Sequence, residues 1–143
     1  MMNHFLTNTE MASLVEAIKL AEDHSSGEIR VHIDSTGLDN FAKKAFHIFQ
    51  SLEMHNTKER NAVLFYVNFE QHYLTIIGDE GIHKKVKQSF WDTLHDEITA
   101  EFAKENYHNG LKDAILKTGY ELKKYFPFEG ENINELPNDL SFS

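Results

Sequence analysis

The chain has 143 residues, of which 41% are hydrophobic and 26% charged, as in one globular domain with a single core. Its formal net charge of −9 argues against a nucleic-acid partner, which would require a basic surface, and favours cationic partners. The absence of cysteine excludes disulfides, thiolate metal sites and thiol nucleophiles.

Neither a signal peptide nor a membrane span is expected from the hydropathy pattern. The N-terminal residues Met1–Asn8 contain neither a basic region nor an apolar run of signal-peptide length. No window approaches the roughly 18 apolar residues of a membrane span. We therefore expect a cytoplasmic protein with no transmembrane segment.

Apolar periodicity predicts the first elements in chain order. Residues Thr9–Asp23 carry apolar side chains at helical spacing, and Thr7 or Thr9 is the expected N-cap. The segment Glu28–Asp34 alternates polar and apolar residues, which predicts a strand with one wet or half-covered face. A second helical stripe runs through Leu38–Leu52.

The next two segments predict a pair of buried strands. Ala62–Val67 and Tyr73–Ile77 are continuous apolar runs, and the link between them is long enough only for an antiparallel hairpin. Two helical stripes follow, through Val86–Phe102 and Leu111–Phe126, and Asn109–Gly110 is the expected break between these helices.

The predicted order is therefore α-β-α-β-β-α-α. A right-handed crossover makes the first two strands parallel, and helices on both faces of a small mixed central sheet give an α/β/α sandwich. We expect this domain to span residues 1–127. Residues 128–143 are expected to be an acidic C-terminal tail, ordered at most by docking residues such as Ile133 and Leu136.

One edge of this sheet is expected to gather carboxylates, an arginine and glycines. Ser25–Glu28 and Thr57–Asn61 precede the parallel strands, and Gly78–Gly81 follows the antiparallel one, so all three segments fall at the same edge. Ca²⁺ and Mg²⁺ prefer oxygen ligands of this kind. The expected metal ligands are Glu28, Glu59, Asp79 and Glu80, supported by Thr57, Arg60, Asn61, Gly78 and Gly81.

The same residues also have an explanation without a ligand. Glu59 and Arg60 form a surface ion pair in that interpretation, Asp79 caps the following helix, and Glu28 is a solvated strand end.

A rival site lies at the opposite edge of the sheet. Ligands in open α/β sheets favour the carboxyl ends of parallel strands. There Asp34 and Asp39 flank a turn that faces Asn68 and Glu70. These residues are candidates to hold a metal ion or a phosphate at the start of the second helix.

Four motifs resemble the TPM domain family, in its bacterial branch of small single-domain proteins. They are Ser26–Val31, Thr57–Leu64, Gly78–Ile82, and Gly110–Leu111 with Phe126–Pro127. The resemblance runs from about residue 9 to residue 127 and implies an α/β/α sandwich. It also implies divalent-cation binding and accessory roles in membrane complexes. From the related thylakoid-lumen proteins of photosystem repair it implies acid phosphatase activity.

Three functional hypotheses follow. The first is a divalent-cation-binding accessory or interaction protein. The second is a metal-dependent acid phosphatase for phosphomonoesters, with Arg60 and Asp79 as candidate catalytic residues. Phe5–Glu10 stands where plant-type members have an Asp-rich segment, which separates this chain from them. The third is recruitment of a protein partner by the acidic tail, or by the Arg30 and His32 face of the first strand.

Overall fold

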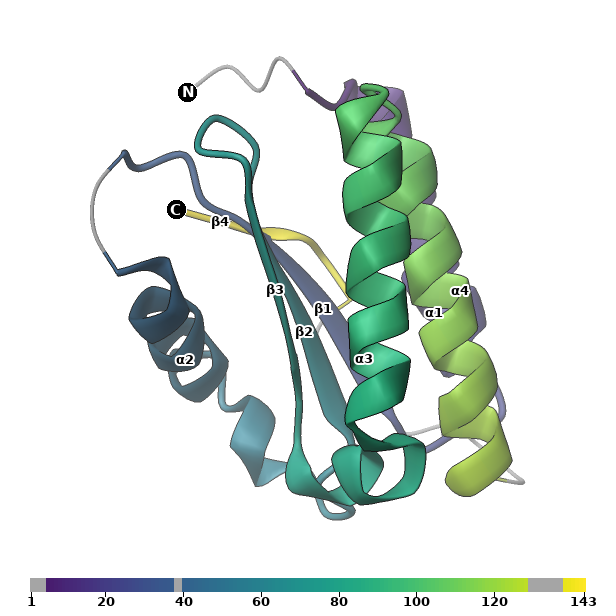
Figure 1. Ribbon diagram of the computed structural model, residues 1–143. Helices are drawn as coiled ribbons and strands as arrows, with labels where there is room; N and C mark the ends of the chain where they lie inside the picture. The colour runs from purple at the N-terminus through teal and green to yellow at the C-terminus, as the bar shows by residue number, and fades with distance from the viewer. Residues whose placement is uncertain (1–4, 38–39, 129–137) are drawn as a thin grey trace.

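The chain folds into three layers, with a four-stranded sheet between helices (Figure 1). The computed structural model describes residues 5–37, 40–128 and 138–143. In chain order the elements are α1 (Asn8–Glu22), β1 (Glu28–Ile33), α2 (Phe41–Ser51), η1 (Met54–Asn56), β2 (Ala62–Asn68), β3 (Tyr73–Gly78), α3 (Glu80–Ala103), α4 (Tyr107–Tyr125) and β4 (Ser141–Phe142).

The strands lie in the order β3-β2-β1-β4. β1 is parallel to β2 and to β4, whereas β2 and β3 are antiparallel. Helix α2 and the 3-10 helix η1 cover one face of the sheet, and α1, α3 and α4 cover the other (Figure 1). The predicted α/β/α sandwich with a small mixed sheet is confirmed, and η1 and β4 are elements that sequence patterns did not predict.

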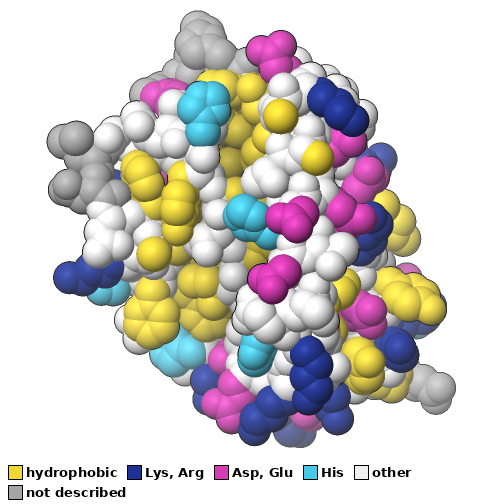
Figure 2. Space-filling view, in the orientation of Figure 1, with side chains coloured by type: hydrophobic (Ala, Val, Ile, Leu, Met, Phe, Trp, Pro, Cys, Tyr) yellow, Lys and Arg dark blue, Asp and Glu magenta, His cyan; other side chains and the backbone are white. Residues whose placement is uncertain are grey.

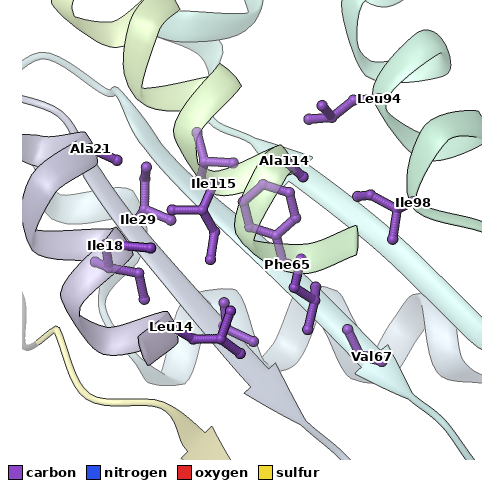
Figure 3. Close-up of a cluster of buried hydrophobic side chains, with 14 of the residues drawn as sticks. Leu14, Ile18, Ala21, Ile29, Phe65, Val67, Leu94, Ile98, Ala114 and Ile115 are labelled. Carbon is purple, nitrogen blue, oxygen red and sulfur yellow. The ribbon is translucent and has the colours of Figure 1, made fainter. Parts of the chain in front are cut away.

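The larger core lies between the sheet and helices α1, α3 and α4 (Figure 3). Ile29 of β1 and Phe65 of β2 point into it, and both side chains are fully buried. Ile18, Ile98 and Ile115 meet them from α1, α3 and α4 respectively. These helical residues belong to the apolar stripes that the 3.6-residue period predicts.

A smaller core lies under α2 on the other face of the sheet. Ala45 and Phe49 of α2 pack there with Met54 of η1 and with Leu64 and Tyr66 of β2. Residues on both faces of β2 are thus buried, which confirms the prediction for this continuous apolar run.

Helices α1 and α4 approach closely at a glycine. A Cβ at Gly119 would lie only 2.5 Å from the Cβ of Ala21, closer than any two side chains pack. Glycine at this position therefore sets the spacing of the two helices. None of the helices in the described ranges is both long and apolar enough to cross a membrane.

The expected break at Asn109–Gly110 is wrong. Helix α3 ends at Ala103 and α4 begins at Tyr107, so this dipeptide lies inside the first turn of α4. The chain reverses instead at Glu105, whose φ is 63°. A Cβ at Gly110 would lie 3.1 Å from the Cβ of Glu101, so this glycine permits helix packing rather than a turn.

The expected half-wet face of β1 is also wrong. Every residue of β1 is buried, including Arg30 and His32 at 7% and 3% exposure. The reason is long-range: residues 139–143 contact these side chains, since Arg30 donates to the carbonyl of Asp139 and His32 lies within hydrogen-bond distance of Ser141 and Ser143. The polar face of β1 is therefore no free surface for a partner. The end of the expected tail is thus part of the fold, and Leu140 packs against the core. The suggested docking residues Ile133 and Leu136 lie outside the described residues.

β3 forms one edge of the sheet and faces the viewer in Figure 1. Hydrophobic side chains reach the surface along this edge, between α2 and α3 (Figure 2). The carbonyl of Leu74 is not free, because Nε2 of His95 on α3 lies 3.0 Å from it. This contact occupies one backbone acceptor of the β3 edge, which hinders pairing of that part of the edge with another strand.

Candidate functional site

The first candidate edge forms where the loop before β2 packs on the start of α3. The carbonyl of Arg60 accepts the N–H of Gly81 at 2.8 Å, and Arg60 itself has a φ of 53°. A Cβ at Gly81 would lie 2.1 Å from the carbonyl oxygen of Glu59. Only glycine allows the loop and the helix to approach this closely. The second and third predicted segments therefore lie side by side.

Asp79 is engaged by an arginine at this edge. Nε and Nη2 of Arg60 donate to its two carboxylate oxygens at 2.8 and 2.9 Å. The backbone N–H of Glu80 donates to the same carboxylate at 2.8 Å, so Asp79 also caps α3. These hydrogen bonds and the charge of Asp79 raise the pKa of Arg60. Asp79 is 6% exposed and has partners on both oxygens, so a metal ion would compete with Arg60 for it.

Glu28 lies against a second carboxyl group that the sequence analysis missed. Glu22 and Glu28 are 3% and 2% exposed and hydrogen-bond to each other. The N–H of Ile29 also donates to Oε2 of Glu22 at 2.7 Å. Burial and the Glu28 charge together raise the pKa of Glu22 to about 9, so this pair holds a shared proton near neutral pH. The missed signal was the spacing of Leu14, Ile18 and Glu22, which puts Glu22 on the buried helical stripe.

The other two predicted ligands are exposed. Glu80 pairs with Lys84 at 3.3 Å one turn along α3, and Glu59 lies on the surface of the loop. Across residues 5–37, 40–128 and 138–143, no three His, Cys, Asp or Glu side chains are close enough to hold a metal ion together. The edge thus brings Arg60, Asp79 and Glu80 together, with Glu28 turned toward α1.

The supporting residues organise this loop. Thr57 Oγ1 accepts the N–H of Asn61 at 3.2 Å, and Asn61 Nδ2 donates to Ser26 Oγ at 3.0 Å. Asn61 is fully buried, and its Oδ1 has no hydrogen-bond partner in the described structure. Gly78 packs on Trp91, since a Cβ there would lie 2.3 Å from the indole ring. Each of these residues has a structural task in holding the strand ends together.

A cavity of about 610 Å³ opens at the opposite edge, at the carboxyl ends of the parallel strands. It lies between the start of α1, the end of β1, the β2–β3 turn and β4. Asp34 and Glu70 are the ionisable residues among its described lining. The described residues that line it are Phe5, Leu6, Asn8, Met11, Ile33, Asp34, Ser35, Phe69, Glu70, Phe142 and Ser143.

Asp34 is a buried carboxylate that stays ionised. Burial by itself raises its pKa, but hydrogen bonds from Thr36 and Tyr66 outweigh it and lower the pKa to about 2. Thr36 donates through its hydroxyl at 2.6 Å and its N–H at 2.8 Å, and the Tyr66 hydroxyl donates from β2. Lys44 Nζ lies 3.7 Å from Oδ2 of Asp34. Burial and the bond to Asp34 raise the pKa of Tyr66 in turn.

Asn68 ties the loop after β1 to the turn after β2. Its Nδ2 donates to the carbonyl of Thr36 at 2.8 Å, and its Oδ1 accepts the N–H of Gln71 at 3.1 Å. Glu70, in the same turn, is exposed and lines the cavity. The structure therefore brings together Asp34, Asn68 and Glu70 of the rival site, whereas Asp39 lies outside the described residues.

The end of the chain completes this edge through His32. The two ring nitrogens of His32 lie 2.8 Å from Ser141 Oγ and 2.7 Å from Ser143 Oγ. Burial lowers the pKa of His32. Residues 142 and 143 then form one wall of the cavity. No local sequence signal marks them, because their partners are more than a hundred residues away in the chain.

Three of the solved structures that share this architecture are bacterial proteins. The BA42 protein of the psychrophile Bizionia argentinensis is 42% identical, with a TM-score of 0.90 over 100% of this chain and 99% of that one. The N-terminal domain of a P. gingivalis protein is 16% identical, with a TM-score of 0.73 over 91% of this chain and 84% of that one. The N-terminal domain of the Corynebacterium glutamicum protein cg2496 is 13% identical, with a TM-score of 0.62 over 82% and 74%. The last two similarities concern the fold alone.

No curated protein matches this chain. The family model of the TPM domain matches residues 2–121, which span α1 through most of α4. This range contains the residues of both candidate edges except Phe142 and Ser143 of the cavity. The chain therefore belongs to the TPM domain family.

Proposed function

We propose that this protein is a divalent-cation-binding accessory protein, with its cation site at the cavity beside β1. The observation that carries the proposal is the charge of the cavity lining. Asp34 and Glu70 line it, and its described residues include no lysine, arginine or histidine. A cavity with acidic groups and no base favours a cation.

The donor atoms suit Ca²⁺ or Mg²⁺. Carboxylates, hydroxyls and amide oxygens are the ligands that these hard cations prefer, and Asp34, Glu70, Ser35 and Asn8 offer all three kinds. Asp34 needs no deprotonation at neutral pH, because its pKa is about 2. A bound ion would tie the loop after β1 to the β2–β3 turn. The site of Glu28, Glu59, Asp79 and Glu80 stays a prediction, with the Arg60 ion pair as its competitor.

Titration of metal-stripped protein with Ca²⁺ and then Mg²⁺, followed by backbone amide NMR shifts, tests the proposal. We expect saturable shifts at 33–37 and 68–71. Glu70→Gln should weaken the affinity by about tenfold or more, since even outer-shell partners of a metal contribute that much. Glu53→Gln, which makes the same charge change at an exposed acid beyond the end of α2, is the matched control. Shifts confined to residues 57–61 and 78–81 would move the cation site to the first edge. The absence of any saturable shift at millimolar cation would refute the proposal of cation binding.

A second candidate function is metal-dependent hydrolysis of phosphomonoesters at the first edge. The Arg60 side chain is 47% exposed beside Asp79, so its guanidinium is within reach of a phosphate from solvent. The assay is hydrolysis of p-nitrophenyl phosphate with and without Mg²⁺ or Ca²⁺. Activity should require the cation and disappear in Arg60→Ala and Asp79→Ala. Hydrolysis unchanged from the wild type in both variants would identify a contaminant.

A protein partner for the acidic tail and a cytoplasmic location stay predictions. Deletion of residues 128–143 is a poor test of the partner, because it also removes β4 from the sheet. Neutralising substitutions such as Asp139→Asn keep the backbone contact of this residue with Arg30. Loss of partner binding in such variants, with β4 intact, would support a role for the tail's charge.

A further inference from the structure

The cavity beside β1 is larger and more apolar than a metal ion requires. Its volume of about 610 Å³ lies in the range of roughly 300–1,000 Å³ that is typical of sites for small organic ligands. A metal ion with ligands at about 2.5 Å fills only the acidic end of such a space. Most of the other described lining residues are apolar, namely Phe5, Leu6, Met11, Ile33, Phe69 and Phe142, whereas Asn8, Ser35 and Ser143 are polar.

The aromatic walls are held in place by one another. The Phe5 ring stacks on Phe69 with centroids 5.0 Å apart, and the ring of Tyr107 meets both edge-on at 5.2 and 5.0 Å. Phe142 of β4 is 57% exposed on the rim of the cavity. Preformed aromatic faces at a concave site attract organic cations through the ring quadrupole.

The charge of the cavity points to the same class of ligand. Asp34 and Glu70 contribute negative charge, and Asp34 is buried, where a charge is weakly screened. Lys44 approaches the Asp34 carboxylate at 3.7 Å but is not among the residues that line the cavity. A positively charged group in the cavity would therefore meet two carboxylates and aromatic rings. At Asp34 it would compete with Lys44 and with the hydrogen bonds from Thr36 and Tyr66.

We propose that this cavity binds an organic ammonium ion, a protonated or quaternary amine that carries an apolar group. The ammonium lies toward Asp34 and Glu70, and the apolar group lies against Phe5, Phe69 and Phe142. This inference goes beyond metal binding, because the amine supplies its own positive charge.

Three probes of one shape and different charge test the proposal. The full chain, ¹⁵N-labelled and kept in EDTA at pH 7, is titrated with phenethylammonium, 2-phenylethanol and 3-phenylpropionate. We expect saturable amide shifts at 33–35 and 69–70, with the ammonium binding tightest and the carboxylate weakest. Equal affinities for the three probes, a preference for the carboxylate, or no saturation by the ammonium would overturn the proposal. EDTA separates these outcomes from the Ca²⁺ and Mg²⁺ titration, so either proposal can fail alone.

Two pairs of matched variants test the geometry. Lys44→Gln removes the competing cation and should tighten phenethylammonium binding about twofold to fivefold, as expected for one partly exposed charge pair. Lys43→Gln, on the neighbouring residue without an ion pair to Asp34, should leave it unchanged. Phe142→Ala should weaken all three probes, whereas Phe46→Ala removes a similarly exposed ring at 53% on α2 and should weaken none. Equal effects within either pair would place the ligand elsewhere.

Discussion

Replacement of Glu22 by glutamine should abolish a pH dependence that the buried carboxyl pair imposes on folding. In the native state burial and the charge of Glu28 raise the pKa of Glu22 from 4.5 to about 9, against the weaker opposing effects of the Ile29 hydrogen bond and the Arg30 charge. Between these two values the folded protein keeps a proton that the unfolded chain has lost. Stability from this group is therefore complete below pH 4.5 and is lost as the pH rises toward 9.

The expected slope follows from one proton. A difference of one bound proton changes the free energy of unfolding by about 1.4 kcal/mol per pH unit, so stability falls by at most ~2.7 kcal/mol from pH 6 to pH 8. The amide of Glu22→Gln mimics the protonated acid, because it accepts from the Ile29 N–H and donates to Glu28. We expect the variant to lose this slope and to be the more stable protein at pH 8.

Urea denaturation at pH 5, 6, 7 and 8 measures both proteins. The lowered pKa of His32 gives the opposite slope, because the unfolded chain then binds the proton, but it cancels in the difference between the two proteins. Glu16→Gln is the control, since Glu16 is exposed on the same helix beside Lys19. A difference between wild type and Glu22→Gln that stays constant with pH would refute the shared proton.

Three further predictions concern other parts of the fold. Gly119→Ala should lower the free energy of unfolding by about 1–3 kcal/mol, because its Cβ would lie 2.5 Å from that of Ala21; an unchanged melting temperature would show that the helices separate freely. Tyr66→Phe should lower the free energy of unfolding by about 1.5–3 kcal/mol at pH 7 and raise the pKa of Asp34, measured by carboxyl NMR titration. The difference in stability between this variant and the wild type should narrow as the pH falls below 4 toward 2. An Asp34 pKa that stays near 2 in the variant would contradict this prediction. His32→Ala should speed amide hydrogen exchange at residues 142–143 and leave the exchange rates in β3 unchanged. Protection of residues 142–143 equal to that in the wild type would mean that the backbone pairing alone holds β4.

The local pattern of the candidate sites was visible in the sequence, but the chemical state of their carboxylates was not. Chain order placed 57–61 and 78–81 at one edge, and Gly81 does contact Arg60. The pairing of Asp79 with Arg60, and of Glu28 with Glu22, depends on side-chain directions that spacing alone does not specify. Asp34 was a candidate because it follows a parallel strand, but its ionised state depends on hydrogen bonds from Thr36 and from the Tyr66 hydroxyl on the next strand.

The sequence by itself determined the three-layer fold, because a 3.6-residue apolar period defines the buried face of each helix and continuous apolar runs mark the strands β2 and β3. It also offered Thr7 and Thr9 as caps of α1, and the structure selects Thr7, whose hydroxyl accepts the N–H of Glu10 while the Glu10 carboxylate accepts that of Thr7. Only the tertiary structure decided the place of β4 and the shape of the cavity. Both depend on contacts such as that of His32 with Ser141, which are 109 residues apart in the chain. A contact between two isolated polar side chains produces no periodic pattern in the sequence, so the sequence did not reveal it.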